Sequence, residues 1–327
     1  MAVNISLVAS PDKQSRRAVL SRSGLPWTAL VSGLLLLPFM NVGAFTLSIA
    51  TTVLITGIAA SSLHLIIRMG HVSLAHAAFA GIGAYAAVIA AMRFGLPSVF
   101  TFVVAFLAPA IVALLFGPIL LRLTGKYFVL GTFMFGEIVR LVLLDWKSVT
   151  NGAAGILGIP PPGRTFAEPA DFYFLVLGFA VVCVGFCHRV LSSEIGRAMD
   201  SLREGEAIAK CSGVPGPALK VTIFTIACGL AGIAGALQAY QVRYIDPGAF
   251  SALQSLNLLV MNVIGSLTHL GGSLVGVVFI VLLPELLRDF VAVQRIIFGV
   301  VLIVVMAFVP GGLVEVATRI AGLWRRR

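Results

Sequence analysis

RVLSSEIGRAMDSLREGEAIAKCSGVPGPALK, residues 189–220, is the one long charged stretch in the middle of an otherwise apolar chain. It carries five basic and four acidic residues, and its helix-forming residues continue until Gly213, Pro215 and Gly216 end the pattern. We therefore expect a short amphipathic helix pair that lies outside the membrane, between two spanning helices. A solvated loop that only connects those two helices is the alternative.

The composition around this stretch is that of a membrane protein. Hydrophobic residues make up 59% of the 327 residues and charged residues 11%, and the mean hydropathy is +1.05. A spanning helix needs about 20 apolar residues. Six runs have no Asp, Glu, Lys or Arg and supply about seven or eight crossings: 25–67, 69–92, 94–121, 221–242, 247–284 and 296–314.

We predict an all-α, polytopic integral membrane protein with about 8–10 hydrophobic helical segments. Ten can be laid out, at residues 25–42, 45–66, 72–92, 98–121, 127–145, 172–189, 217–241, 253–268, 271–287 and 295–316. Glycines at 265, 271 and 272 interrupt the run 247–287. Broken or re-entrant helices are expected there, because irregular backbone is tolerated at membrane depth where protein or a wet cavity surrounds it.

The basic residues predict the orientation. The net charge is +10, and in a ten-crossing layout six basic residues lie outside while most of the others lie inside: Lys13, Arg16, Arg17, Arg22, Arg68, Arg122, Lys126, Arg189, Arg197, Arg203, Lys210, Lys220, Arg319 and Arg325 to Arg327. The positive-inside rule then puts both termini and the stretch 189–220 in the cytoplasm. We expect basic tails at 1–24 and 317–327, one transmembrane domain at 25–316, and a turn-rich outer loop at 146–171.

The chain lacks the usual signatures of an enzyme. Gly125-Lys126 has no upstream glycine for a phosphate-binding loop, and neither the five histidines nor the four cysteines have the spacing of a catalytic or metal-binding cluster. We predict that the chain by itself is not an enzyme and holds no cofactor or metal.

The most unusual apolar stretch runs from Gly70 to Tyr85. Gly70 can end one helix and Ser73 can cap the next, which would leave backbone N–H groups near the bilayer midplane, free to bind a substrate carboxylate. Five residues of this stretch are therefore candidates for lining a substrate path across the membrane: Gly70, His71, Ser73, His76 and Tyr85. The alternatives are that the small residues only allow close helix packing and that the histidines lie at the interface.

Polar residues inside other spans extend this candidate path. Glu137 and Arg140 are spaced i, i+3 in an apolar segment, where a lone charge costs about 2.5–3.5 kcal/mol. They should pair, or face water or protein, either as a structural ion pair or as part of a path. Asn257 and Asn262 are expected to form hydrogen bonds across helices, and Asn257 is also a candidate path residue.

Several motifs resemble those of the LivM-type permease subunits of branched-chain amino acid ABC importers. They cover about residues 46–288 and include the pattern GHVSLxHAAFxGIGAY at 70–85, LTGKYF at 123–128, FGEIVR at 135–140 and GRA at 196–198. Some positions depart from the family pattern: Ala75 and Ala153 replace glycines, and Ile208 follows Glu206-Ala207.

The resemblance implies half of a translocation pathway for leucine, isoleucine, valine or related small molecules, in the bacterial inner membrane. The implied partners are a homologous permease, two cytoplasmic ATPases that bind ATP and Mg, and an extracytoplasmic binding protein. The stretch 189–220 would then be the segment that couples to an ATPase, through Glu194, Gly196, Arg197, Ala198, Glu206, Ala207 and Gly213.

Three alternatives stay open. Relatives in the family carry urea and short amides. A secondary transporter driven by an ion gradient would need ion sites in the membrane and no docking segment. A membrane scaffold would transport nothing.

Overall fold

The helices are arranged as the apolar pattern predicts. The computed structural model describes residues 38, 43–211, 213–287, 297 and 299–300. All eight segments expected between residues 45 and 287 are helices, with ends that differ from the prediction by at most four residues. The expected segments 25–42 and 295–316 and both basic tails lie, apart from single positions, outside the described residues. The helices from Ala44 onward belong to one unit, residues 44–327.

Three helices form the inside of this unit. α3 (Ala44–Arg68), α4 (His76–Met92) and α11 (Gly216–Val242) pack against one another, and the most apolar stretches of α3 and α11 are 72% and 67% buried. Small residues allow the close approach of α4 and α11: a Cβ on Gly83 would lie 2.3 Å from the Cα of Gly232.

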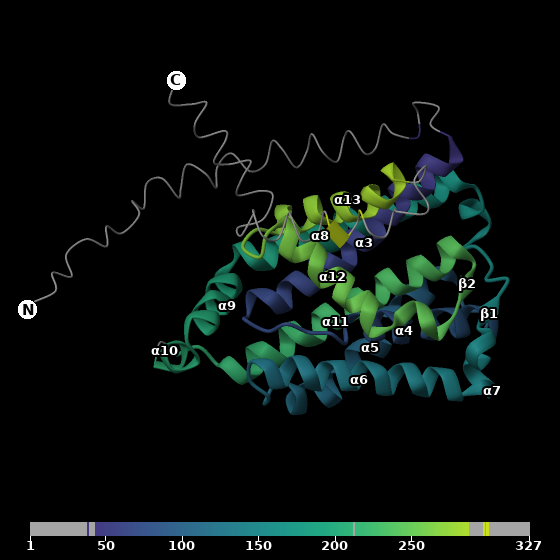
Figure 1. The fold of residues 1–327 in the computed structure, drawn as a ribbon. Coiled ribbons are helices and arrows are strands. Elements are labelled where there is room, and N and C mark those ends of the chain that lie inside the picture. Colours follow the sequence, from purple (N-terminus) through teal and green to yellow (C-terminus); the bar gives the residue numbers. More distant parts are fainter. Residues whose placement is uncertain (1–37, 39–42, 212, 288–296, 298, 301–327) are drawn as a thin grey trace, which may run out of the picture. The chain divides into compact units, whose positions relative to one another are not determined.

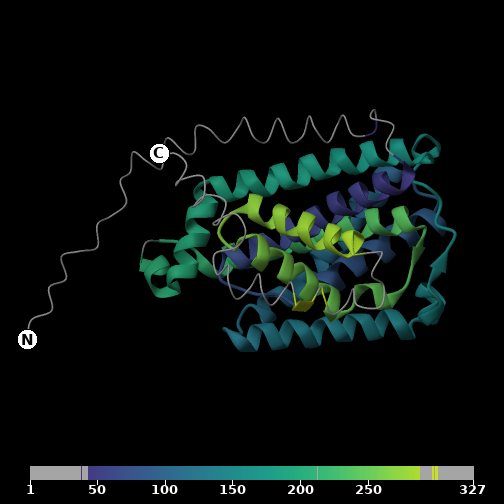
Figure 2. The same ribbon diagram turned by 45° about the horizontal axis from the view of Figure 1, so that its top comes forward.

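Longer apolar helices surround this core. α5 (Ser98–Leu120), α6 (Lys126–Asp145) and α8 (Pro169–Ser192) are only 33%, 22% and 39% buried over their most apolar stretches. Their exposed side chains are mainly large and apolar, as expected for helices that face lipid or another subunit. Figure 2 shows α8 and α6 on opposite sides of the inner helices. Including α3 and α11, five of the described helices are long and apolar enough to cross a membrane.

The run 247–287 folds as a bent pair of helices. α12 (Ala252–Gly265) and α13 (Leu270–Leu286) bend by 117° at a short break, and together they are long and apolar enough for one further span. A Cβ on Gly265 would lie 1.9 Å from the carbonyl oxygen of Gly272, so the two helices pack backbone to backbone. The predicted broken or re-entrant geometry is confirmed.

The two ends of the bundle carry different connections (Figure 1). At one end lie α9 (Glu194–Glu204) and α10 (Glu206–Cys211). At the other end, α7 (Lys147–Thr150), η2 (Gly152–Ala154), η3 (Arg164–Phe166) and η4 (Pro247–Phe250) accompany a small sheet. Its antiparallel strands β1 (Ile156–Leu157) and β2 (Tyr244–Ile245) join the expected turn-rich loop to the end of α11.

Candidate functional site

The charged stretch forms the helix pair that its sequence predicts. Ser193 caps α9, because its hydroxyl accepts a hydrogen bond of 3.2 Å from the N–H of Ile195. Met199 and Leu202 are buried on the inner side of α9. A Cβ on Gly216 would lie 3.0 Å from the Leu202 side chain, so α9 packs on the first turn of α11.

An ion pair holds α10 against the same helix. The Lys220 ammonium donates to the Glu206 carboxylate over 2.7 Å. The Lys220 side chain is buried, whereas that of Glu206 is 55% exposed. This hydrogen bond, more than any other interaction, lowers the pKa of Glu206 below its usual value, because it favours the charged carboxylate.

The predicted coupling residues divide into an outer and an inner group. Glu194, Arg197, Glu206, Ala207 and Gly213 are exposed, and Arg197 forms an ion pair with Glu194 one turn away. Ala198 is half-buried. The exposed residues are therefore available to a partner.

Gly196 is placed differently from the prediction of a contact residue. It is buried, and a Cβ there would lie 2.1 Å from the backbone oxygen of Leu191. No side chain fits at this corner between α8 and α9. Gly196 therefore shapes the corner rather than presenting a surface to a partner, and its replacement would distort the segment itself.

The start of the candidate path lies at the same end as α9, not half-way along a span. Gly70 follows the last turn of α3, has a φ of +83°, and a Cβ there would lie 3.5 Å from the Arg203 side chain of α9. His71 is half-buried and packs edge-on against Phe128, with ring centroids 4.9 Å apart. The expectation of a midplane site at Gly70 and His71 is therefore wrong, because α3 runs its full 25 residues before the chain turns.

The other candidates of this stretch are buried between helices. The Ser73 hydroxyl accepts from the N–H of Ala75, while α4 begins at His76, so Ser73 does not cap the helix as expected. His76 lies 2.7 Å from the Ser62 hydroxyl of α3. The Tyr85 side chain is 2% exposed. These three residues lie inside the bundle rather than on an open surface.

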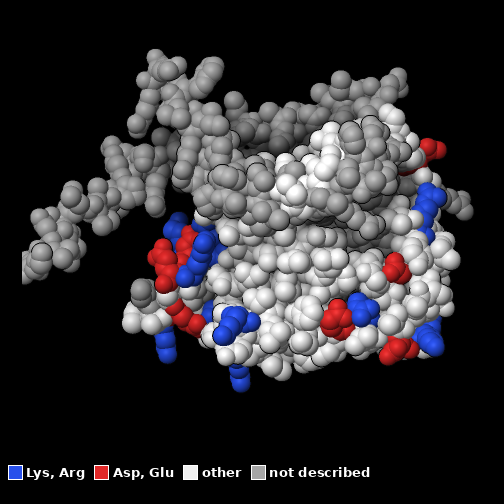
Figure 3. Space-filling view, viewed as in Figure 1, with Lys and Arg blue, Asp and Glu red and all other residues white. Residues whose placement is uncertain are grey.

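α6 carries the polar candidates that remain at the surface. The Arg140 guanidinium donates to Glu137 over 2.8 Å, which confirms the expected pair, and both side chains are partly exposed, at 28% and 29%. Figure 3 shows an uncharged band between two charged ends of the molecule, with an acidic and basic patch over α6 inside the band.

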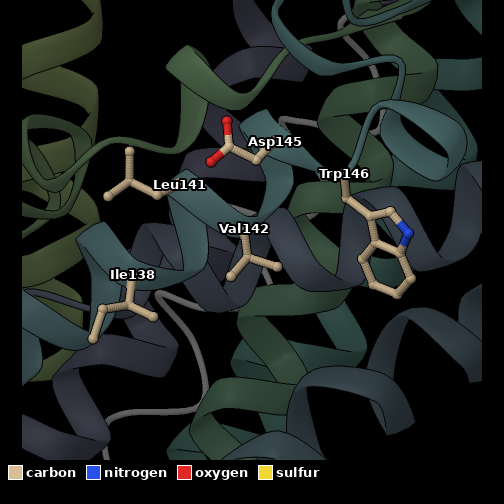
Figure 4. Close-up of a pocket in the computed structure, with 5 residues that line it drawn as sticks. All are labelled: Ile138, Leu141, Val142, Asp145 and Trp146. Carbon is tan, nitrogen blue, oxygen red and sulfur yellow. The ribbon is translucent and has the colours of Figure 1, made fainter.

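Most of the remaining exposed side chains of α6 are large and apolar. Ile138, Leu141, Val142, Asp145 and Trp146 line a shallow depression of about 450 Å³ along this helix (Figure 4). On neighbouring α12, Asn257 is half-buried and donates a hydrogen bond to Gln254 on its own helix. Among the residues that the structure describes, Asn257 therefore makes no bond across helices, whereas Asn262 makes the expected one, to the backbone oxygen of Ala60 at 3.2 Å.

The sequence of the chain matches a known protein family. Residues 45–309 match the family described as the permease component of branched-chain amino acid transport systems. The chain belongs to this family.

Two curated relatives support the assignment. The chain is 30% identical over 303 residues to the "High-affinity branched-chain amino acid transport system permease protein LivM" of Escherichia coli K12, covering 84% of this chain and 71% of that protein. The protein of the same name from Salmonella typhimurium LT2 matches with the same identity and coverage. No solved structure matches. This permease is thus a multi-pass membrane component of a transport system and not an enzyme, as the sequence predicted.

The sequence interpretation missed a buried polar cluster in the permease. His64 Nδ1 lies 2.9 Å from the Ser273 hydroxyl and 3.3 Å from Asn262 Oδ1, and Ser273 donates to the same oxygen over 2.7 Å. The cluster joins α3 to both α12 and α13. The polar run Ser61-Ser62-x-His64 in an otherwise apolar helix was the signal that could have shown it.

Proposed function

We propose that this permease forms one half of the translocation pathway of an ATP-driven importer for leucine, isoleucine, valine or chemically related small molecules. One observation carries the proposal: in a chain of this family, the amphipathic α9–α10 segment projects from the bundle with its charged face exposed. The names of the two LivM relatives supply the substrate class.

The distribution of charge supports a cytoplasmic position for α9 and α10. The described basic residues at this end include Arg68, Arg122, Lys126, Arg189, Arg197, Arg203, Lys210 and Lys220, whereas Arg93, Lys147 and Arg243 lie toward the other end. Basic residues concentrate in cytoplasmic loops. The protein would therefore lie in the bacterial inner membrane with this end in the cytoplasm, and the predicted cytoplasmic termini follow from the same rule.

The exposed face of α9 and α10 would dock on a cytoplasmic ATPase. Two such subunits would bind ATP and Mg, so that the permease itself needs no cofactor. An extracytoplasmic binding protein would deliver the substrate at the end that carries β1 and β2.

The outer face of α6 would border the path. An ion pair within a span faces protein or water rather than lipid, because hydrocarbon solvates charges poorly. Glu137 and Arg140 remain about one quarter exposed in the single chain, which fits an uncovered side that a homologous permease subunit would cover. The half-buried Asn257 on α12 would lie close to this path, whereas Ser73, His76 and Tyr85 would support it from inside the bundle.

The test is uptake by the assembled transporter in proteoliposomes. With binding protein outside and ATP inside, we expect accumulation of radiolabelled leucine, isoleucine or valine, but none with a non-hydrolysable ATP analogue. Vesicles that contain the permease without the ATPases are the control. Uptake that an ion gradient drives in the absence of ATP would contradict the proposal and favour a secondary transporter.

A further inference from the structure

One guanidinium joins three parts of the molecule at the α9 end. Arg68, the last residue of α3, binds Asp200 of α9 with two hydrogen bonds, Nε to Oδ1 at 2.5 Å and Nη2 to Oδ2 at 2.7 Å. Its third nitrogen, Nη1, donates to the backbone oxygen of Thr268, in the break between α12 and α13. Arg68 therefore contacts the coupling segment and the bent helix pair at the same time.

The geometry requires arginine. A planar guanidinium can grip a carboxylate with two parallel N–H groups and still offer a third donor in another direction. A lysine ammonium keeps the charge but lacks this fixed fork. An exposed ion pair alone has little effect on stability, but the Arg68 side chain is only 22% exposed and its contacts reach two separate elements.

The element on the far side of Arg68 is internally stiff. The hydroxyls of Ser266 and Thr268 lie 2.9 Å apart within the break, and the Thr268 N–H donates to the Ser266 hydroxyl over 3.2 Å. A Cβ on Gly276 would lie 1.9 Å from the backbone oxygen of Met261, so α12 and α13 leave no space to slide against each other. A displacement of Thr268 would therefore move α12 and α13 together.

A second contact holds this pair to α3 one turn deeper. His64 lies four residues before Arg68 and bonds Asn262 of α12 and Ser273 of α13 through the buried cluster. The bent pair is thus attached to α3 at an inner polar cluster and at the outer Arg68 contact. Of these two attachments, Arg68 is the one that also binds α9.

We propose that Arg68 is a positioning residue that transmits displacement of α9 to the α12–α13 pair, through the chain Asp200–Arg68–Thr268. The inference rests on the proposed role of α9 as the ATPase-coupling segment. In this account a shift of α9 moves the bent pair, and α12 lies beside α6, whose outer face borders the proposed path.

Three variants of the assembled transporter separate this role from a merely structural ion pair. Arg68→Lys keeps the charge but loses the fork. Asp200→Asn removes the carboxylate and leaves the Thr268 contact. The exchange Arg68→Asp with Asp200→Arg restores a pair between α3 and α9, but an aspartate at position 68 cannot donate to the Thr268 carbonyl.

The measurement is the ratio of substrate transported to ATP hydrolysed in proteoliposomes, with subunit stoichiometry checked for each variant. We expect all three variants to assemble and to lower the ratio about fivefold or more, with hydrolysis retained. Recovery of the wild-type ratio in the exchange variant, or an unchanged ratio in Arg68→Lys, would overturn the proposal. A wild-type transporter without ATP-driven uptake would instead refute the proposed function.

A second readout follows the bent pair directly. Cys211 is exposed and would react with a maleimide, so it is first replaced by Cys211→Ser. Thr268 is also exposed, and with Thr268→Cys we expect the rate of maleimide labelling at position 268 to change when ATP and vanadate are added to the assembled transporter. With Arg68→Lys we expect this change to disappear. A change that persists in the variant would show that the pair moves without Arg68 and would overturn the proposal.

Discussion

Gly235→Leu is expected to prevent the permease from folding stably. A Cβ at this position of α11 would lie 2.0 Å from the backbone oxygen of Ala80 in α4, and 2.6 Å from its carbonyl carbon. Because the obstacle is backbone, no side-chain rotation can relieve it, and the two inner helices would have to separate. We expect Gly235→Leu to lower the free energy of unfolding by more than the ~1–3 kcal/mol that is typical of an overpacked core.

The chain offers a matched control in another helix. Gly185 lies in α8, and no other part of the described chain comes within 4 Å of its ideal Cβ position. Gly185→Leu should therefore change the thermal stability of the detergent-purified permease little, whereas Gly235→Leu should abolish its monodisperse peak in size-exclusion chromatography. Equal effects of the two substitutions would show that α4 and α11 are not packed as described.

Arg197→Glu is expected to uncouple uptake from ATP hydrolysis. Arg197 is exposed on the outer face of α9 and pairs with its neighbour Glu194, so the substitution places two acidic side chains together on the proposed docking face. Loss of a charge contact at an interface weakens the binding free energy by about 2 kcal/mol or more. Because this corresponds to a factor of about thirty or more, we expect uptake to fall about thirtyfold or more. Assembly of the permease itself should be unchanged, because no buried contact is lost.

Arg122→Glu makes the same charge change at the same end of the bundle. Arg122 is exposed in the turn between α5 and α6, outside α9 and α10. We expect this control to keep most of the ATP-driven uptake in proteoliposomes. Normal uptake by Arg197→Glu, or an equal loss in both variants, would remove the special role of α9.

The helices could be predicted because long apolar runs, broken by charges, glycines and prolines, report directly on what can cross a bilayer. The same holds for the pair Glu137–Arg140, whose spacing on one helix brings the two charges together without any knowledge of the fold. The break near Gly265 was also visible, since clustered glycines interrupt the apolar run.

The positions of the site residues depend on contacts that are distant in sequence. The sequence near Gly196 does not indicate that the backbone of Leu191 fills the space beside it. Likewise, Arg68 forms hydrogen bonds with residues that are 132 and 200 positions away in the sequence. Small-residue patterns predict close packing but not the partner. The run AGIGA at 80–84 packs against the similar run AGIAG at 231–235, although nothing in either run identifies the other as its partner. The depth of Gly70 depended on the full length of α3, which extends to Arg68.

The most direct test of the central claim is to purify the tagged permease from its native membrane in mild detergent and to identify and quantify what accompanies it. An importer that couples through α9 and α10 predicts a cytoplasmic ATPase and a second permease in a fixed ratio. The coupling role of this segment would be contradicted if the permease were recovered alone or as a homodimer and the Arg197→Glu variant were recovered in the same form.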